Sequence, residues 1–271
     1  MTLTIDIETY SPTDLARSGV YKYAEHPDFC ILLFGYAVDD GEVKVVDLAK
    51  GERIPDEILQ ALTDPLVTKW AFNAICLSRY LREHCPSYFL SYGEAGDTAG
   101  KYLDPLGWKC SQVLASSFGF PLSLKDLGNA LGLSEKKMDE GSRLIGLFSL
   151  PGPMGRRLPE EFPEEWELFK KYNARDVEVE MEVRKVCSSF HAPASLWEEY
   201  HEDQRINDRG IPVDIPFVKA ALAMGEKAGM DLLSRLKHLT GLLNPKSPCQ
   251  MKAWLSANGQ KTDSLTKKET A

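Results

Sequence analysis

The chain has 271 residues, of which 43% are hydrophobic, and a formal net charge of −8. This length suits one large domain or two smaller ones, and the hydrophobic share is enough for a buried core. The negative charge excludes a protein that coats nucleic acid with bulk positive charge, and no apolar run approaches the roughly 20 residues of a membrane-spanning helix.

Residues 3–8 alternate between apolar and polar side chains, which predicts a β-strand at the start of the chain. Residues two apart in a strand face the same side, so Asp6 and Glu8 would present two carboxylates opposite Ile5 and Ile7. Neighbouring carboxylates repel each other, and a divalent ion such as Mg²⁺ or Mn²⁺ relieves that repulsion. The pattern therefore indicates half of a metal site. The alternative is an edge strand with a solvated acidic face.

The segment that follows reads as a loop containing Pro12 and Gly19 and then two strands. We predict these strands over residues 30–38 and 43–48, joined by a turn at 39–41. Together with the first strand they form three consecutive, antiparallel neighbours.

Further along the chain, helical and extended segments alternate. Pro55 opens a predicted helix that runs through Leu62, because proline is favoured in a first helical turn. A fourth strand is predicted at residues 67–72, followed by a helix from Asn73. Residues 87–100 read as a loop, and the pattern of residues 103–118 is compatible with strand or helix.

A short helix after Ser123 and a long one over residues 164–186 are predicted next, on either side of a loop at 151–163. Tyr172 and Asp176 are four residues apart and share one face of the long helix. We also predict that Glu178 and Glu180 lie on a solvated face and that Trp108 and Trp166 belong to the core. Strands followed by helices around a mixed sheet indicate an α/β fold.

The character of the chain changes near residue 191, so we predict one domain at 1–190 and a second segment at 191–271. Helices are expected at 196–207, 217–239 and 249–258. From Ala228 onward, seven basic residues accompany three acidic ones, which indicates a phosphate-facing surface or a solvated helical face. The chain ends in polar residues without a closing core element, as expected for part of a longer protein.

An Asp-x-Glu pair on a first strand, combined with Tyr-x-x-x-Asp on a late helix, resembles the DEDD-type 3′–5′ exonucleases. More closely, the chain resembles the proofreading domain of family A DNA polymerases (DNA polymerase I), especially phage and prophage members. Residues beyond about 190 look like the start of the polymerase thumb. The motifs that carry this resemblance are DIETY at 6–10, GVYKYA at 19–24, YNARDVE at 172–178 and QRINDRG at 204–210.

The resemblance implies a ribonuclease-H-like fold, a mixed five-stranded sheet flanked by helices and followed by a partial helical segment. It implies phosphodiester hydrolysis by two Mg²⁺ or Mn²⁺ ions. By the same resemblance, Asp6, Glu8 and Asp176 are metal ligands and Tyr172 orients the attacking water, whereas Thr9 and Asn73 contact the substrate. The implied partners are a single-stranded or frayed 3′ end of DNA and the remaining polymerase domains.

The chain departs from the family at the second motif. The family places an acid four residues after the asparagine that corresponds to Asn73, and this chain has Leu77 there. Glu83 is the nearest downstream acid. It lies nearly three helical turns beyond Asn73 and is a poor substitute for the expected acid. It is as though about one helical turn had been lost. We therefore expect a site with three carboxylates and an impaired exonuclease.

Two other classes of function compete with an active exonuclease. One is a catalytically weak or inactive domain that binds nucleic acid or serves as a polymerase scaffold. The other is a stand-alone RNA-trimming enzyme, against which the thumb-like tail argues. The six cysteines show neither CxxC spacing nor zinc-like clustering, and no signal peptide is visible, so we expect reduced thiols and a cytoplasmic protein.

Overall fold

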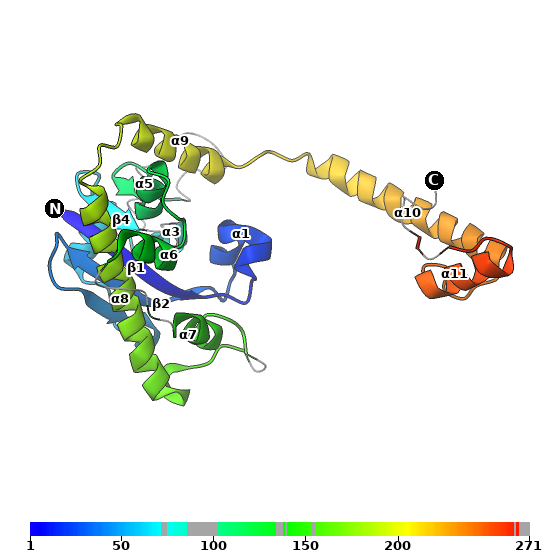
Figure 1. The fold of residues 1–271 in the computed structure, drawn as a ribbon, viewed down its shortest axis with the longest axis horizontal. Helices are drawn as coiled ribbons and strands as arrows, with labels where there is room; N and C mark the ends of the chain where they lie inside the picture. The colour runs from blue at the N-terminus through cyan, green and yellow to red at the C-terminus, as the bar shows by residue number, and fades with distance from the viewer. Residues whose placement is uncertain are drawn as a thin grey trace. The chain divides into compact units, whose positions relative to one another are not determined.

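The computed structural model describes residues 1–71, 75–85, 102–133, 138, 140–152, 155–262 and 264–265. The chain divides into two compact units, Met1–Gly210 and Ile211–Ala271 (Figure 1). The domain boundary that we predict between residues 190 and 191 stays a prediction.

A mixed five-stranded sheet forms the centre of the first unit, in the order β3-β2-β1-β4-β5. Its strands are β1 (Thr2–Tyr10), β2 (Cys30–Val38), β3 (Lys44–Asp47), β4 (Thr68–Ala71) and β5 (Trp108–Lys109). The first three strands are antiparallel neighbours, as predicted, whereas β4 is parallel to β1 and β5 is parallel to β4. This is the expected ribonuclease-H-like sheet. Because β1 lies in its middle, the alternative of a solvated edge strand is wrong.

The connection between β2 and β3 is the predicted hairpin turn. Asp39 has a φ of 50°, and the Gly41 N–H donates to the Val38 carbonyl at 3.0 Å. The pairing of β1 with β2 shifts register between Glu8 and Thr9. Such an irregularity bends the strand locally and redirects its side chains. It falls at the end of β1 that carries the acidic pair.

Ten helical segments are described in the first unit, and five of them (α2, α3, α6, α8 and α9) match predicted helices. Helix α6 begins as predicted, because the Ser123 hydroxyl accepts the Asp126 N–H at 3.1 Å. The bounds are α1 (Leu15–Ala24), η1 (Leu48–Lys50), α2 (Asp56–Thr63), α3 (Ile75–His84), α5 (Ser111–Ser117), α6 (Leu124–Leu131), α7 (Gly141–Phe148), η2 (Pro159–Glu161), α8 (Pro163–Cys187) and α9 (Ser195–Arg209).

Two predictions for this unit need correction or completion. The segment predicted as a loop around Pro12 and Gly19 contains helix α1 instead. The Asp14 side chain caps its first turn, and the helix is interrupted at Gly19, whose φ of 78° favours glycine. The ambiguous residues 103–118 contain both kinds of element, the short strand β5 followed by α5.

The core occupies both faces of the sheet. On one face, Leu77 and Leu81 of α3 and Ile58 of α2 pack with Ile5 of β1. On the other face, α8 runs across β1 and β2 (Figure 1) and buries its apolar side against the sheet. Trp108 and Trp166, 2% and 0% exposed, belong to the core as predicted.

The second unit contains α10 (Ile215–Thr240) and α11 (Pro248–Ala257), which cover the helices predicted there. Asp214 caps α10 by accepting the Phe217 N–H at 2.9 Å. Within the described part of the chain, no helix is long and apolar enough to cross a membrane.

Candidate metal centre

Three of the predicted acids converge in space although they come from distant parts of the chain. Asp6 and Glu8 on β1 and Asp176 on α8 each offer a carboxylate oxygen, and these oxygens lie within 4.8 Å of one another. Glu8 and Asp176 are buried, and Asp6 is half-buried. Oxygen donors of this kind and charge are those that Mg²⁺ and Mn²⁺ prefer, so the cluster is able to hold a divalent metal ion.

The Asp6 side chain is held by a residue that we did not single out from the sequence. Asn173 of α8 donates from Nδ2 to Asp6 Oδ2 at 2.8 Å and to the Asp6 carbonyl at 3.3 Å. Asn173 follows Tyr172 directly within the quoted motif. That position was the only sequence signal pointing to it.

Tyr172 lies beside the acids and is 1% exposed. Its ring stacks on Phe169 with centroids 6.1 Å apart, and its hydroxyl is hydrogen-bonded to Asp176. Burial, followed by the charges of Asp176 and Glu8, raises the pKa of Tyr172 far above its ordinary value. The phenol therefore keeps its proton and acts as a hydrogen-bond donor.

Glu180 corrects the prediction of a solvated face on α8. It is 3% exposed, and one of its carboxyl oxygens accepts the Ser111 hydroxyl at 2.7 Å. Burial raises its pKa to about 8; nearby Asp6 and Asp176 add to this rise, and Ser111 and Arg184 oppose it. The prediction failed because α5 covers this turn of α8, and glutamate alone gives no sign of that. Glu178 is only partly exposed and pairs with Arg175 at 3.2 Å.

Thr9 lies next to a cavity of about 190 Å³ that Asp6 also lines. The Thr9 hydroxyl is hydrogen-bonded to the Tyr23 hydroxyl at 2.9 Å. Burial raises the pKa of Tyr23 to about 12, although the Thr9 hydrogen bond lowers it. The predicted substrate contact Asn73 lies outside the described residues.

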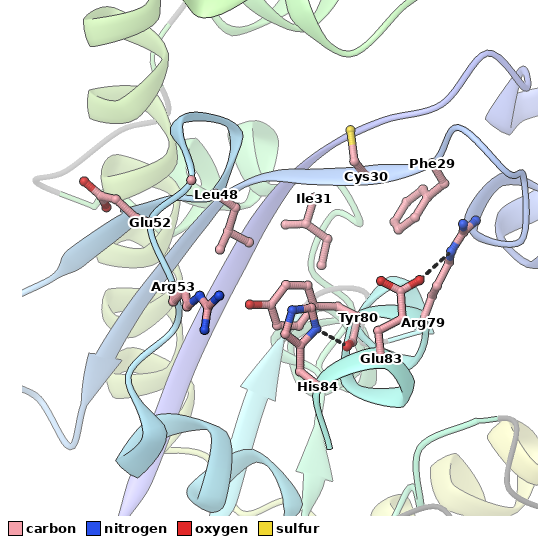
Figure 2. A pocket seen from close by; sticks show the side chains of 11 residues that line it. Phe29, Cys30, Ile31, Leu48, Glu52, Arg53, Arg79, Tyr80, Glu83 and His84 are labelled. Atoms are coloured by element: carbon pink, nitrogen blue, oxygen red, sulfur yellow. Dashed lines mark hydrogen bonds and ion pairs between the residues drawn. The ribbon is translucent and has the colours of Figure 1, made fainter. Parts of the chain in front are cut away.

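The position where the resemblance predicts a fourth acid is apolar in the structure. Leu77 is 1% exposed and lines the same cavity as Asp6. Glu83 pairs with Arg79 at 3.6 Å and, with Tyr80 and His84, lines a separate pocket of about 280 Å³ (Figure 2). Among the described residues, neither Glu83 nor any other acid joins Asp6, Glu8 and Asp176 in one cluster.

No protein-family model matches the chain. Among solved structures, it is similar to Brucella melitensis NrnC, with 14% identity, a TM-score of 0.39, and coverage of 69% of this chain and 72% of that one. The form of NrnC with bound Mg²⁺ covers the same shares at the same identity and gives a TM-score of 0.38.

The similarity at the level of sequence is much higher. The chain is 42% identical to the DNA polymerase of Bacillus phage SP02 over 98% of its own residues. It spans 40% of the length of that polymerase. The resemblance to a phage DNA polymerase is thereby confirmed: this chain is similar, along nearly all of its length, to part of one.

Proposed function

We propose that the chain is the 3′–5′ exonuclease portion of a DNA polymerase and that it removes the 3′-terminal nucleotide of DNA with Mg²⁺ or Mn²⁺. The convergence of Asp6, Glu8 and Asp176 carries this proposal. The relationship to a phage DNA polymerase supports DNA as the substrate and further polymerase domains as partners. The substrate would be a single-stranded or frayed 3′ end, because the proposed site acts on the end of one DNA strand.

Each residue of the site has a distinct role in this proposal. Asp6, Glu8 and Asp176 would hold the metal ions. When bound, the ions supply charge stabilisation to the phosphate and lower the pKa of water. Tyr172 keeps its proton, which its hydroxyl donates to Asp176 in this structure, and the same hydroxyl would orient the attacking water. Thr9, at the adjacent cavity, would contact the terminal nucleotide.

We further propose that the activity is impaired, because Leu77 stands where the fourth acid is expected. A buried leucine offers no oxygen to a metal ion. The second ion would then keep Asp6 and lose its outer carboxylate. Loss of one metal's charge stabilisation costs several kcal/mol, and about 1.4 kcal/mol is tenfold in rate. We expect one strongly bound ion and a rate lowered by orders of magnitude.

A single-turnover assay with 3′-labelled single-stranded DNA tests the activity. Digestion from the 3′ end that requires Mn²⁺ or Mg²⁺ and disappears in Asp6→Ala supports an exonuclease. DNA binding without digestion supports the competing scaffold function, and a preference for short RNA supports an RNA-trimming enzyme.

The impairment has its own test. A four-residue insert with aspartate as its third residue, placed after Ala74, puts that acid four residues after Asn73 and restores the expected spacing of the second motif. We expect it to raise the hydrolysis rate at least tenfold, and the same insert with asparagine as its third residue to leave the rate unchanged. Brisk digestion by the unmodified chain would show that another group fills the gap.

A further inference from the structure

We infer that Asn173 is a positioning residue that fixes the carboxylate of Asp6 for metal binding, and that Gly35 makes room for it. This inference rests on the proposed metal site and adds two residues to it. Neither residue is a metal ligand in the proposal. Both would act through Asp6, which the proposed site uses as a metal ligand.

The two hydrogen bonds of Asn173 fix Asp6 at two points. Nδ2 donates to the carboxylate at 2.8 Å and to the backbone carbonyl of the same residue at 3.3 Å. A donor that bridges these two oxygens sets the rotation of the carboxylate relative to the strand. Partners of this kind orient metal ligands, and their loss typically lowers metal affinity.

The amide of Asn173 is held in an orientation that leaves its oxygen unsatisfied. Asn173 is 0% exposed, and its Oδ1 is buried with no hydrogen-bond partner among the described residues. The flipped amide would place Oδ1 against Asp6 Oδ2, where two acceptors would face each other. A residue selected only to fill the core would be apolar, because a buried acceptor without a partner is unfavourable. Donation to Asp6 is the interaction that accounts for the amide.

Gly35 lies opposite Asp6 in the pairing of β1 with β2. A Cβ at this position would lie 2.5 Å from Asn173 Oδ1 and 3.0 Å from Val177 Cγ2. The first distance is too short for a Cβ contact and the second is tighter than most, so even alanine would displace the amide or the turn of α8 that carries it. The close approach of α8 to β2 at Gly35 is therefore what brings Asn173 within reach of Asp6.

Isothermal titration calorimetry with Mn²⁺ on the full chain tests the inference without using catalysis. Asn173→Leu keeps the side-chain volume and removes the donor. We expect this variant to bind Mn²⁺ about tenfold to a hundredfold more weakly than the wild type, while its metal-free melting temperature stays equal or rises. A loss of packing alone would lower the melting temperature and leave the affinity unchanged.

Two further variants separate positioning from stability. Val177→Ala removes a buried side chain beside Asn173 and leaves both hydrogen bonds in place, so it should lower the melting temperature without changing Mn²⁺ affinity. Gly35→Ala should weaken Mn²⁺ binding in the wild-type background and have no further effect in Asn173→Leu, because both changes act through the same amide.

The outcomes distinguish this inference from the proposed function. If the wild type binds no Mn²⁺, the metal site itself is wrong. If the wild type binds Mn²⁺ and Asn173→Leu binds it equally well, the metal site stands and the role of Asn173 is refuted.

Discussion

Gly141, the first residue of α7, lies directly against the ring of Tyr172. A Cβ at Gly141 would be 2.3 Å from Tyr172 Cε2 and 3.0 Å from its hydroxyl oxygen. The phenol is also hydrogen-bonded to Asp176. The backbone of α7 at Gly141 therefore helps to fix the position of the hydroxyl relative to the acids. Helix α7 is therefore part of the wall of the site, although it contributes no polar side chain to the cluster.

The first prediction concerns this contact. Gly141→Ala should lower the free energy of unfolding by about 1–3 kcal/mol, because the added methyl overpacks the site. It should also displace the Tyr172 hydroxyl and reduce any metal-dependent DNA hydrolysis. Thermal unfolding and the 3′-labelled DNA assay measure the two effects.

The same helix provides a matched control. A Cβ at Gly146 would meet nothing within 4 Å. Gly146→Ala should therefore stabilise the protein by about 0.5–1 kcal/mol, as expected for alanine in place of glycine within a helix, and leave hydrolysis unchanged. Equal effects of the two substitutions would contradict the steric role of Gly141.

The second prediction concerns Asp208 at the end of α9, which accepts the Tyr21 hydroxyl at 2.9 Å. Burial raises the pKa of Asp208 from 3.8 to about 6, and the Tyr21 hydrogen bond opposes that rise. Between these two values the folded protein holds a proton that the unfolded chain has lost. Stability should therefore fall as pH rises through this window and level off above it.

Asp208→Asn keeps an acceptor for Tyr21 and removes the titration. Its melting temperature relative to the wild type should rise as pH increases from 4 to 6 and then stay constant to pH 7. Thermal unfolding in EDTA at several pH values measures this difference. A difference that does not change with pH would show that Asp208 ionises as readily in the folded protein as in the unfolded chain.

The third prediction locates the boundary of the first unit. Helix α9 packs against the sheet: Trp197 contacts Trp70 with ring centroids 5.4 Å apart, and His201 Nε2 is hydrogen-bonded to the Trp108 carbonyl at 2.8 Å. Residues 211–214 are exposed and lie in neither helix nor strand. Limited proteolysis should therefore cut first at 211–214 and leave a resistant fragment that includes α9.

The outcome of that digestion also decides between two boundaries. Early cleavage near residue 190 would support the division predicted from the sequence. Equal protection of the two units would contradict both divisions and show that residues beyond 210 are stabilised within this chain.

Local sequence patterns were sufficient for most elements of the fold and for part of the site. The alternation at residues 3–8 placed Asp6 and Glu8 on one face of a strand, and the four-residue spacing placed Tyr172 and Asp176 on one face of a helix. These relationships depend on residues close in sequence, where the geometry of a strand or helix fixes directions. The helix around Gly19 does not follow from local patterns, because glycine favours loops, although Asp14 caps the helix.

Tertiary structure alone decided what surrounds those residues. Asn173 and Asp6 are 167 positions apart, and their hydrogen bond exists because α8 approaches β2 at Gly35. Glu180 is buried because α5 covers it, whereas its charge predicted a solvated face. A sequence pattern indicates which face of its own helix or strand a side chain occupies. The partner it meets depends on how distant elements pack, and packing of α8 against the sheet is what turns three separate carboxylates into one cluster.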